Sequence, residues 1–240
     1  MKVSGNIVDV LSRKIFPGTL EVQDGKILRI SHHKGSHDCF IIPGFVDAHI
    51  HVESSMLVPS EFARIAVTHG TVATVSDPHE IANVLGSDGV RFMVKNGLQT
   101  PFKFFFGVPS CVPASPFETS GATIGPAAVE ELILHDGMTF LGEVMNVPGV
   151  LTGDPGTMKK IEIARRLGNR VDGHAPGLRG DNLLNYVRAG MSTDHETGNR
   201  EEGREKLSLG MKLIIREGSA ARNMDGLAPL IREYPDLCMF

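Results

Sequence analysis

A short apolar run that ends in two histidines decides the fold of this chain. Residues 41–51 read IIPGFVDAHIH. Alternate side chains of a β-strand point to the same face, so His49 and His51 would direct both imidazoles at one point. Two neutral imidazoles that converge in this way can hold a divalent metal ion. The alternative is a pair of partly exposed histidines at a strand end, and this motif alone does not decide between the two.

Composition limits the class of protein and its partners. The chain has 240 residues, of which 41% are hydrophobic and 22% charged, and a net charge of −4. These values are typical of a soluble globular protein, and they give no reason to expect a nucleic acid or a membrane as partner. Three cysteines without CxxC spacing favour a reduced, cytoplasmic setting. No apolar run reaches membrane-spanning length, and the first residues show no charged segment followed by an apolar core, so we expect neither a membrane span nor a signal peptide.

The first 40 residues resemble a small β region. Alternating runs predict strands over residues 3–10, 19–22 and 26–30, and Asp24-Gly25 predicts a hairpin turn between the last two. The histidines at 32, 33 and 37 lie in a polar linker and are expected in solvated loops. Because so few strands cannot bury a core alone, we predict a partial β domain over residues 1–40.

From residue 41 onward, strand-like and helix-like segments alternate. The predicted strands are 42–51, 71–75, 102–108, 139–144, 170–174, a short one before 192, 212–216 and 237–240, and the helices are 59–69, 80–98, 126–135, 155–167, 181–189, 200–209 and 224–233. Such units favour parallel strands with right-handed crossovers. The polar residues fall at the carboxyl ends of the strands, where a barrel gathers its reactive groups. We therefore predict an α/β fold, a (β/α)8 TIM barrel over residues 41–240, incomplete at its eighth strand.

Polar residues at the predicted strand ends suggest a metal centre. The candidate ligands are His49, His51, Glu143, His174 and His195. Glu143 could bridge two ions with its two oxygens, and such a pair lowers the pKa of a shared water to about 7. Each residue also has a simpler explanation. Glu143 could be a salt-bridged acid, and the neighbours of His195, Asp194 and Glu196, could form an outer carboxylate arrangement.

Several segments resemble one known family. Residues 43–51 resemble the first-strand signature of the amidohydrolase superfamily. The segments HVESSM (51–56), SDPHEIANVLG (76–86), SCVPA (110–114), GHAPGL (173–178) and IREGSAARN (215–223) resemble the adenine deaminases of bacteria and archaea. The resemblance implies hydrolytic deamination of adenine to hypoxanthine and ammonia at two divalent metal ions, manganese or iron with zinc as the alternative. It also implies that Glu143 takes the bridging place of a modified lysine in many relatives.

The resemblance extends to residues that could handle protons and substrate. Asp77 and Glu80 are candidates for the acid that moves a proton to the departing amine, although Asp77-Pro78 also reads as a turn and Glu80 as an ordinary residue of a first helical turn. Arg216, Glu217 and Ser219 match the purine-facing loop and could pair with the edge of adenine. The alternative for this loop is a surface ion pair beside a flexible glycine.

The chain departs from the family in its length. Family members are more than twice as long, and their eighth strand ends in an aspartate that binds metal and carries protons. Here Phe240 is the last residue, and Asp236 precedes the predicted strand. We therefore expect a fragment with little activity alone, completed by a C-terminal segment or a second chain. The alternatives are another cyclic amidohydrolase and a metal-binding remnant without activity, and the sequence leaves open whether the chain forms a homo-oligomer.

Overall fold

The computed structural model describes every residue except 116 and 220. It divides the chain into two compact units, Met1–Phe45 and Val46–Phe240. No helix in the described part of the chain is both long and apolar enough to cross a membrane.

The first unit is a four-stranded sheet with the order β3-β2-β1-β4. Its strands are β1 (Lys2–Asp9), β2 (Lys14–Gln23), β3 (Lys26–His32) and β4 (Phe40–Ile41). Asp24 and Gly25 adopt φ of 51° and 73°, which the turn between β2 and β3 requires, so the predicted hairpin is confirmed. Strand β2 begins at Lys14, five residues before the predicted start, and pairs Pro17 with Asn6 of β1.

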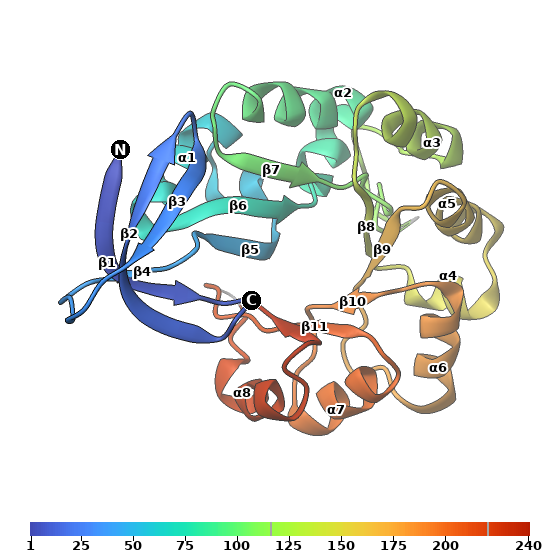
Figure 1. The fold of residues 1–240 in the computed structure, drawn as a ribbon. Helices are drawn as coiled ribbons and strands as arrows, with labels where there is room; N and C mark the ends of the chain where they lie inside the picture. The colour runs from blue at the N-terminus through green and yellow to red at the C-terminus, as the bar shows by residue number, and fades with distance from the viewer. Residues whose placement is uncertain (116, 220) are drawn as a thin grey trace. The chain divides into compact units, whose positions relative to one another are not determined.

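The second unit alternates strands and helices, as predicted. Its strands are β5 (Phe45–Ile50), β6 (Thr71–Ser76), β7 (Lys103–Phe106), β8 (Phe140–Val144), β9 (Arg170–Gly173), β10 (Thr193–Asp194), β11 (Lys212–Ile214) and β12 (Cys238–Met239). Its helices are α1 (Pro59–Ala66), α2 (His79–Gly97), α3 (Pro126–His135), α4 (Val147–Thr152), α5 (Pro155–Arg166), α6 (Gly180–Ala189), α7 (Arg200–Ser208) and α8 (Met224–Glu233), with 3₁₀ turns at Val52–Ser55 and Val67–His69. Figure 1 shows these helices outside the strands.

Hydrogen bonds and parallel pairing join each of these strands to the next. Strands β5-β6-β7, β8-β9 and β10-β11-β12 form three sheets, and the bridges Val108↔Leu141 and Val171↔Met191 connect them. The backbone N–H of Ala48 in β5 donates to the carbonyl oxygen of Phe240, just after β12, at 2.9 Å. The fold is thus α/β, with the carboxyl ends of β5 to β10 directed at one region.

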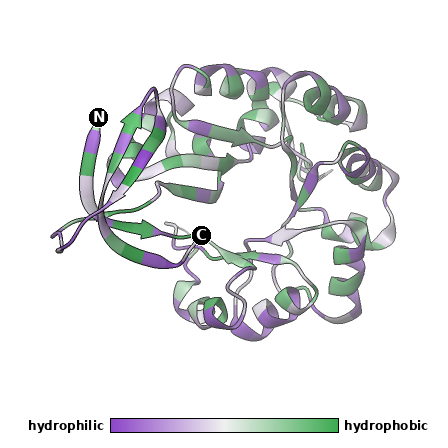
Figure 2. Cartoon of the chain, in the orientation of Figure 1, coloured by the Kyte–Doolittle hydropathy of each residue, from purple (hydrophilic) through white to green (hydrophobic). Residues whose placement is uncertain are grey.

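The helices begin where the sequence supplies the required groups. The side chain of Asp154 accepts the N–H of Thr157 at 2.8 Å at the start of α5, and Asn199 accepts that of Glu202 at 3.0 Å at the start of α7. Hydrophilic and hydrophobic residues alternate along the helices in Figure 2, as expected for helices with one buried side. Fully buried residues such as Leu132 and Ile161 pack these helices against the strands.

Candidate metal centre

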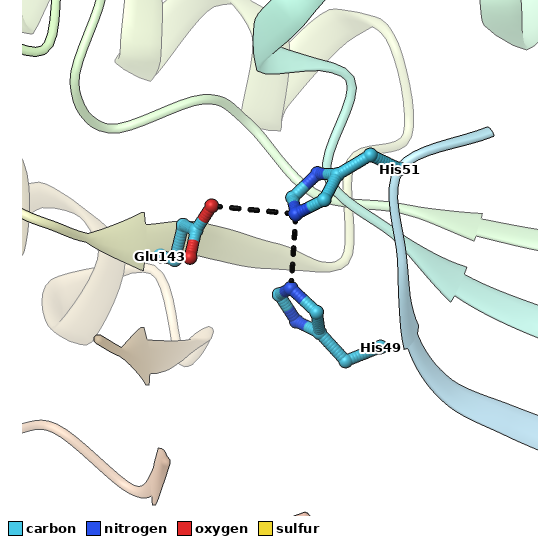
Figure 3. Close-up of side chains that lie close together, drawn as sticks. All are labelled: His49, His51 and Glu143. Carbon is cyan, nitrogen blue, oxygen red and sulfur yellow. Dashed lines mark hydrogen bonds and ion pairs between the residues drawn. The ribbon is translucent and has the colours of Figure 1, made fainter. Parts of the chain in front are cut away.

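Three side chains from two distant parts of the sequence meet at the end of β5. His49 lies in β5, His51 directly follows it, and Glu143 lies in β8. The Nε2 atoms of His49 and His51 are 3.2 Å apart, and Nε2 of His51 is 3.4 Å from Oε1 of Glu143. Figure 3 shows the two rings and the carboxylate pointing toward one another. The structure therefore brings these three predicted ligands together.

The second oxygen of Glu143 faces the other two predicted ligands. Its Oε2 atom lies 2.6 Å from Nδ1 of His174 and 2.8 Å from Nε2 of His195. These histidines directly follow β9 and β10, and the His195 ring stacks on that of His49 with centroids 3.5 Å apart. One carboxylate thus lies between His51, which adjoins His49, and the two histidines that follow β9 and β10.

The protonation pattern of His49 and His51 fits a cation between them. Nδ1 of His51 lies 2.8 Å from the carbonyl oxygen of Asp77, which can only accept, so this nitrogen carries the proton. Nδ1 of His49 lies 3.0 Å from the carboxylate of Asp172 and donates in the same way. Burial works against a charge on His49, but Asp172 raises its pKa, so either a second proton on His49 or a metal cation between the two Nε2 atoms would satisfy their lone pairs. Nitrogens bound to one zinc-like ion at about 2.1 Å each would be separated by a distance close to the observed 3.2 Å.

We call the five side chains of His49, His51, Glu143, His174 and His195 the cluster. Burial and neighbouring charges shift the pKa of several groups in and beside it. Burial alone would raise the pKa of Glu143, but hydrogen bonds from His174 and His195 hold it well below its ordinary value. Burial works against a charge on His79, but the carboxylates of Asp77 and Glu143, 3.4 and 3.3 Å from its Nδ1 atom, raise its pKa to about 9. Glu143 thus remains ionised, and its negative charge attracts cations.

Asp77 lies behind Glu143. Its side chain is buried, and its Oδ2 atom accepts the backbone N–H of Glu143 at 3.0 Å. A Cβ atom on residue 142, which lies in β8 next to Glu143, would be 2.4 Å from this oxygen, so only glycine fits at this position of the strand. The pairing of β8 with β9 also shifts register between Leu141 and Val144, where Glu143 turns toward the cluster.

Two residues outside the predicted set belong to the cluster. Asp172 is a hydrogen-bond partner of His49, and it forms a group with His49 and His195 whose ligand atoms lie within 4.8 Å of one another. His79 forms a similar group with Asp77 and Glu143. Asp172 stands two residues before His174, so the alternation that marked His49 and His51 could also have indicated it.

The remaining predicted site residues are not all close to the cluster. Glu80 is exposed and accepts a hydrogen bond from the hydroxyl of Ser54. Nη2 of Arg216 lies 2.8 Å from Oε1 of Glu196, which itself lies 4.0 Å from Nε2 of His195. Glu217 and Ser219 are exposed, and Glu217 pairs loosely with Arg222 at 3.9 Å. Arg216 alone of these three is connected to the cluster, through Glu196.

The sequence profile of the amidohydrolase family matches residues 40–228. The chain belongs to the amidohydrolase family. Curated relatives of this amidohydrolase include the adenine deaminases of Sulfurovum sp. (strain NBC37-1), 59% identical over 240 residues, and of Salinibacter ruber, 56% identical over 238 residues. The alignments cover 100% and 99% of this chain but 45% and 44% of the relatives, so the chain spans less than half of their length.

Solved structures of other proteins share the fold of this amidohydrolase. N-acetyl-D-glucosamine-6-phosphate deacetylase from Mycobacterium smegmatis superimposes with a TM-score of 0.62 at 14% identity, over 99% of this chain and 69% of that one. A 5-methylcytosine deaminase from Klebsiella pneumoniae gives a TM-score of 0.52 at 17% identity, over 89% and 65%. At these identities the likeness concerns the fold alone.

Proposed function

We propose that this chain carries the two-metal centre of an enzyme that hydrolyses adenine to hypoxanthine and ammonia. The observation that carries the proposal is the position of Glu143: its Oε1 atom faces His51, which lies against His49, and its Oε2 atom faces His174 and His195. The substrate is inferred from the relatives, which are named adenine deaminases. Nitrogen and carboxylate ligands suit manganese or iron, with zinc as the alternative.

His49 and His51 would hold one ion with Oε1 of Glu143, and His174 and His195 the other with Oε2. When bound, two such ions supply a hydrolytic nucleophile near neutral pH. Asp172 fixes the ring of His49 by accepting from its Nδ1 atom, and the carbonyl oxygen of Asp77 does the same for His51. These outer contacts hold the rings of His49 and His51 in place before substrate arrives.

Deamination breaks the bond between carbon six of adenine and its amino nitrogen, and that nitrogen must gain a proton. Asp77 and His79 form a pair 3.4 Å apart beside Glu143, and we assign the proton transfer to this pair. Glu80 would have to break its hydrogen bond with the hydroxyl of Ser54 before it could take part in proton transfer. We assign recognition of the purine edge to Arg216, with Glu217 and Ser219 as further contacts when the loop closes on substrate.

We also propose a specific arrangement of the strands and helices. The hydrogen bond between Ala48 and Phe240 and the consecutive pairing of β5 to β12 support a (β/α)8 barrel over residues 41–240, incomplete at its eighth strand, preceded by a partial β domain over residues 1–40. Cys39, Cys111 and Cys238 are free among the described residues, which supports a cytoplasmic setting.

The test separates metal binding from turnover. The purified chain is loaded with Mn²⁺ or Fe²⁺, its metal content is measured, and ammonia release from adenine is assayed with and without the C-terminal part of the Sulfurovum relative. We expect two ions per chain, and deamination in at least one of the two assays. His174→Ala should lose one ion and all activity, whereas His135→Ala, at the exposed end of α3, should lose neither. Two ions without ammonia in either assay would reject adenine as the substrate.

A further inference from the structure

An ammonium group is buried behind the cluster. Lys206 of α7 is completely inaccessible to solvent. Its Nζ atom lies 2.7 Å from Oε1 of Glu202, 2.8 Å from the carbonyl oxygen of Ala175, 3.0 Å from Oδ1 of Asp194 and 3.2 Å from the hydroxyl of Thr197. Lysine is almost never fully buried unless it is paired, and its three protons are shared here among four acceptors. The side chain is therefore held at one position.

These contacts reach the two loops that carry His174 and His195. Ala175 directly follows His174, and Asp194 directly precedes His195. Asp194 also joins the loops itself, because Oδ2 accepts the N–H of Ala175 at 2.8 Å and Oδ1 accepts the N–H of Glu196 at 3.0 Å. Lys206 and Asp194 thus fix the backbone on both sides of His195 and immediately after His174.

Glu202, one turn before Lys206 on α7, holds the far ends of the same loops. Its Oε1 atom accepts the N–H of Gly177 at 2.8 Å, and its Oε2 atom accepts that of Gly198 at 3.2 Å. We call Lys206, Asp194 and Glu202 the ion triad. It carries one positive and two negative charges, a net charge of −1, next to the proposed cation site.

We propose that Lys206 is a positioning residue for the second metal subsite, which consists of His174, His195 and Oε2 of Glu143. The proposal rests on the two-metal centre proposed above. Apolar residues could fill the space of a buried ion triad at little or no cost in stability, so stability alone does not explain its presence. Its contacts instead converge on residues 174–177 and 194–198, whose backbone determines where the two imidazoles point. Outer contacts of this kind control metal affinity without touching the metal.

The test uses the double variant Lys206→Met/Glu202→Gln, which removes the ammonium and keeps the net charge of the triad at −1. The control is Leu207→Ala, which opens a cavity at the neighbouring buried position of α7 without touching either loop. Mn²⁺ binding is measured by calorimetry, and folding by thermal unfolding in EDTA. The double variant should bind the first ion as the wild type does and the second about 10- to 100-fold more weakly. Leu207→Ala should lower the melting temperature and keep both affinities.

A second measurement assigns the effect to the subsite. In a His174→Ala background the second subsite is already lost, so adding the double variant should change Mn²⁺ binding less than about twofold. Backbone amides of residues 175–177 and 196–198 should exchange with deuterium faster in the double variant than in Leu207→Ala. The inference is overturned if the double variant binds both ions with wild-type affinity, or if both affinities fall by the same factor. A wild-type chain that binds fewer than two ions would instead overturn the two-metal centre, whatever the variants do.

Discussion

Gly142→Ala tests how Glu143 is held in place. A Cβ atom at this position would lie 2.4 Å from Oδ2 and 2.6 Å from Cγ of Asp77, so the carboxylate must move. Asp77 is 1% exposed, and its Oδ2 atom accepts the N–H of Glu143 at 3.0 Å. The substitution therefore crowds a packed site and breaks a hydrogen bond to an ionised acceptor at the same time.

The expected loss of stability follows from these two effects. Overpacking costs about 1–3 kcal/mol, and losing a hydrogen bond to a charged group costs about 1.5–3 kcal/mol, so the free energy of unfolding should fall by about 2.5–6 kcal/mol. Mn²⁺ affinity should fall as well, because the backbone of Glu143 is no longer fixed.

Urea unfolding in EDTA measures the first effect and calorimetry the second. The matched control is Gly226→Ala in α8, where an added Cβ meets no described atom within 4 Å. Alanine favours the helix there, so the control should be stabilised by up to about 1 kcal/mol. A Gly142→Ala protein within about 0.5 kcal/mol of the wild type, a change typical of an unconstrained surface site, would refute this reasoning.

Three further predictions concern single side chains. Because the pKa of His79 is raised to about 9, its proton stabilises the EDTA-treated protein fully below pH 6.5, and this contribution, at most about 3 kcal/mol, is lost as the pH rises to 9. Urea unfolding of His79→Gln should lack that part of the pH dependence, and an unchanged slope would contradict the assignment. Asp172→Asn leaves His49 without its ionised acceptor, so calorimetry should show Mn²⁺ affinity about 10- to 100-fold lower, and an unaltered affinity would count against the role of Asp172. Asp154→Ala removes the cap of α5 and should cost about 1 kcal/mol in urea unfolding, with no loss of Mn²⁺ binding; a loss of binding would show that the cap also shapes the cluster.

Local patterns were sufficient to predict most elements and to select five candidate metal ligands that the structure brings together. The His49-Ile50-His51 spacing fixes two rings on one face of a strand, and Glu143, His174 and His195 stand at the ends of runs with clear strand composition. The alternation of strands and helices then places these ends in one region. None of this required knowledge of the contacts between distant segments.

The role of Asp172, the start of β2 and the presence of α4 depend on contacts that the sequence does not display. Asp172 matters because it accepts from His49, which lies 123 positions away in the chain. Strand β2 begins at Lys14 because its first residues pair with β1. Glycine is required at 18, since a Cβ atom there would lie 2.7 Å from the carbonyl oxygen of Ser31. Helix α4 was missed because its Pro148-Gly149 reads as a turn, whereas Asn146 accepts the N–H of Gly149 and starts a helix.

The proposed two-metal centre requires that Glu143 lie between two cations. Anomalous diffraction from a crystal of this chain grown with Mn²⁺ tests it most directly. Two peaks are expected, one between Oε1 of Glu143 and the Nε2 atoms of His49 and His51, and the other between Oε2 and the rings of His174 and His195. One peak, or peaks away from Glu143, would contradict the claim.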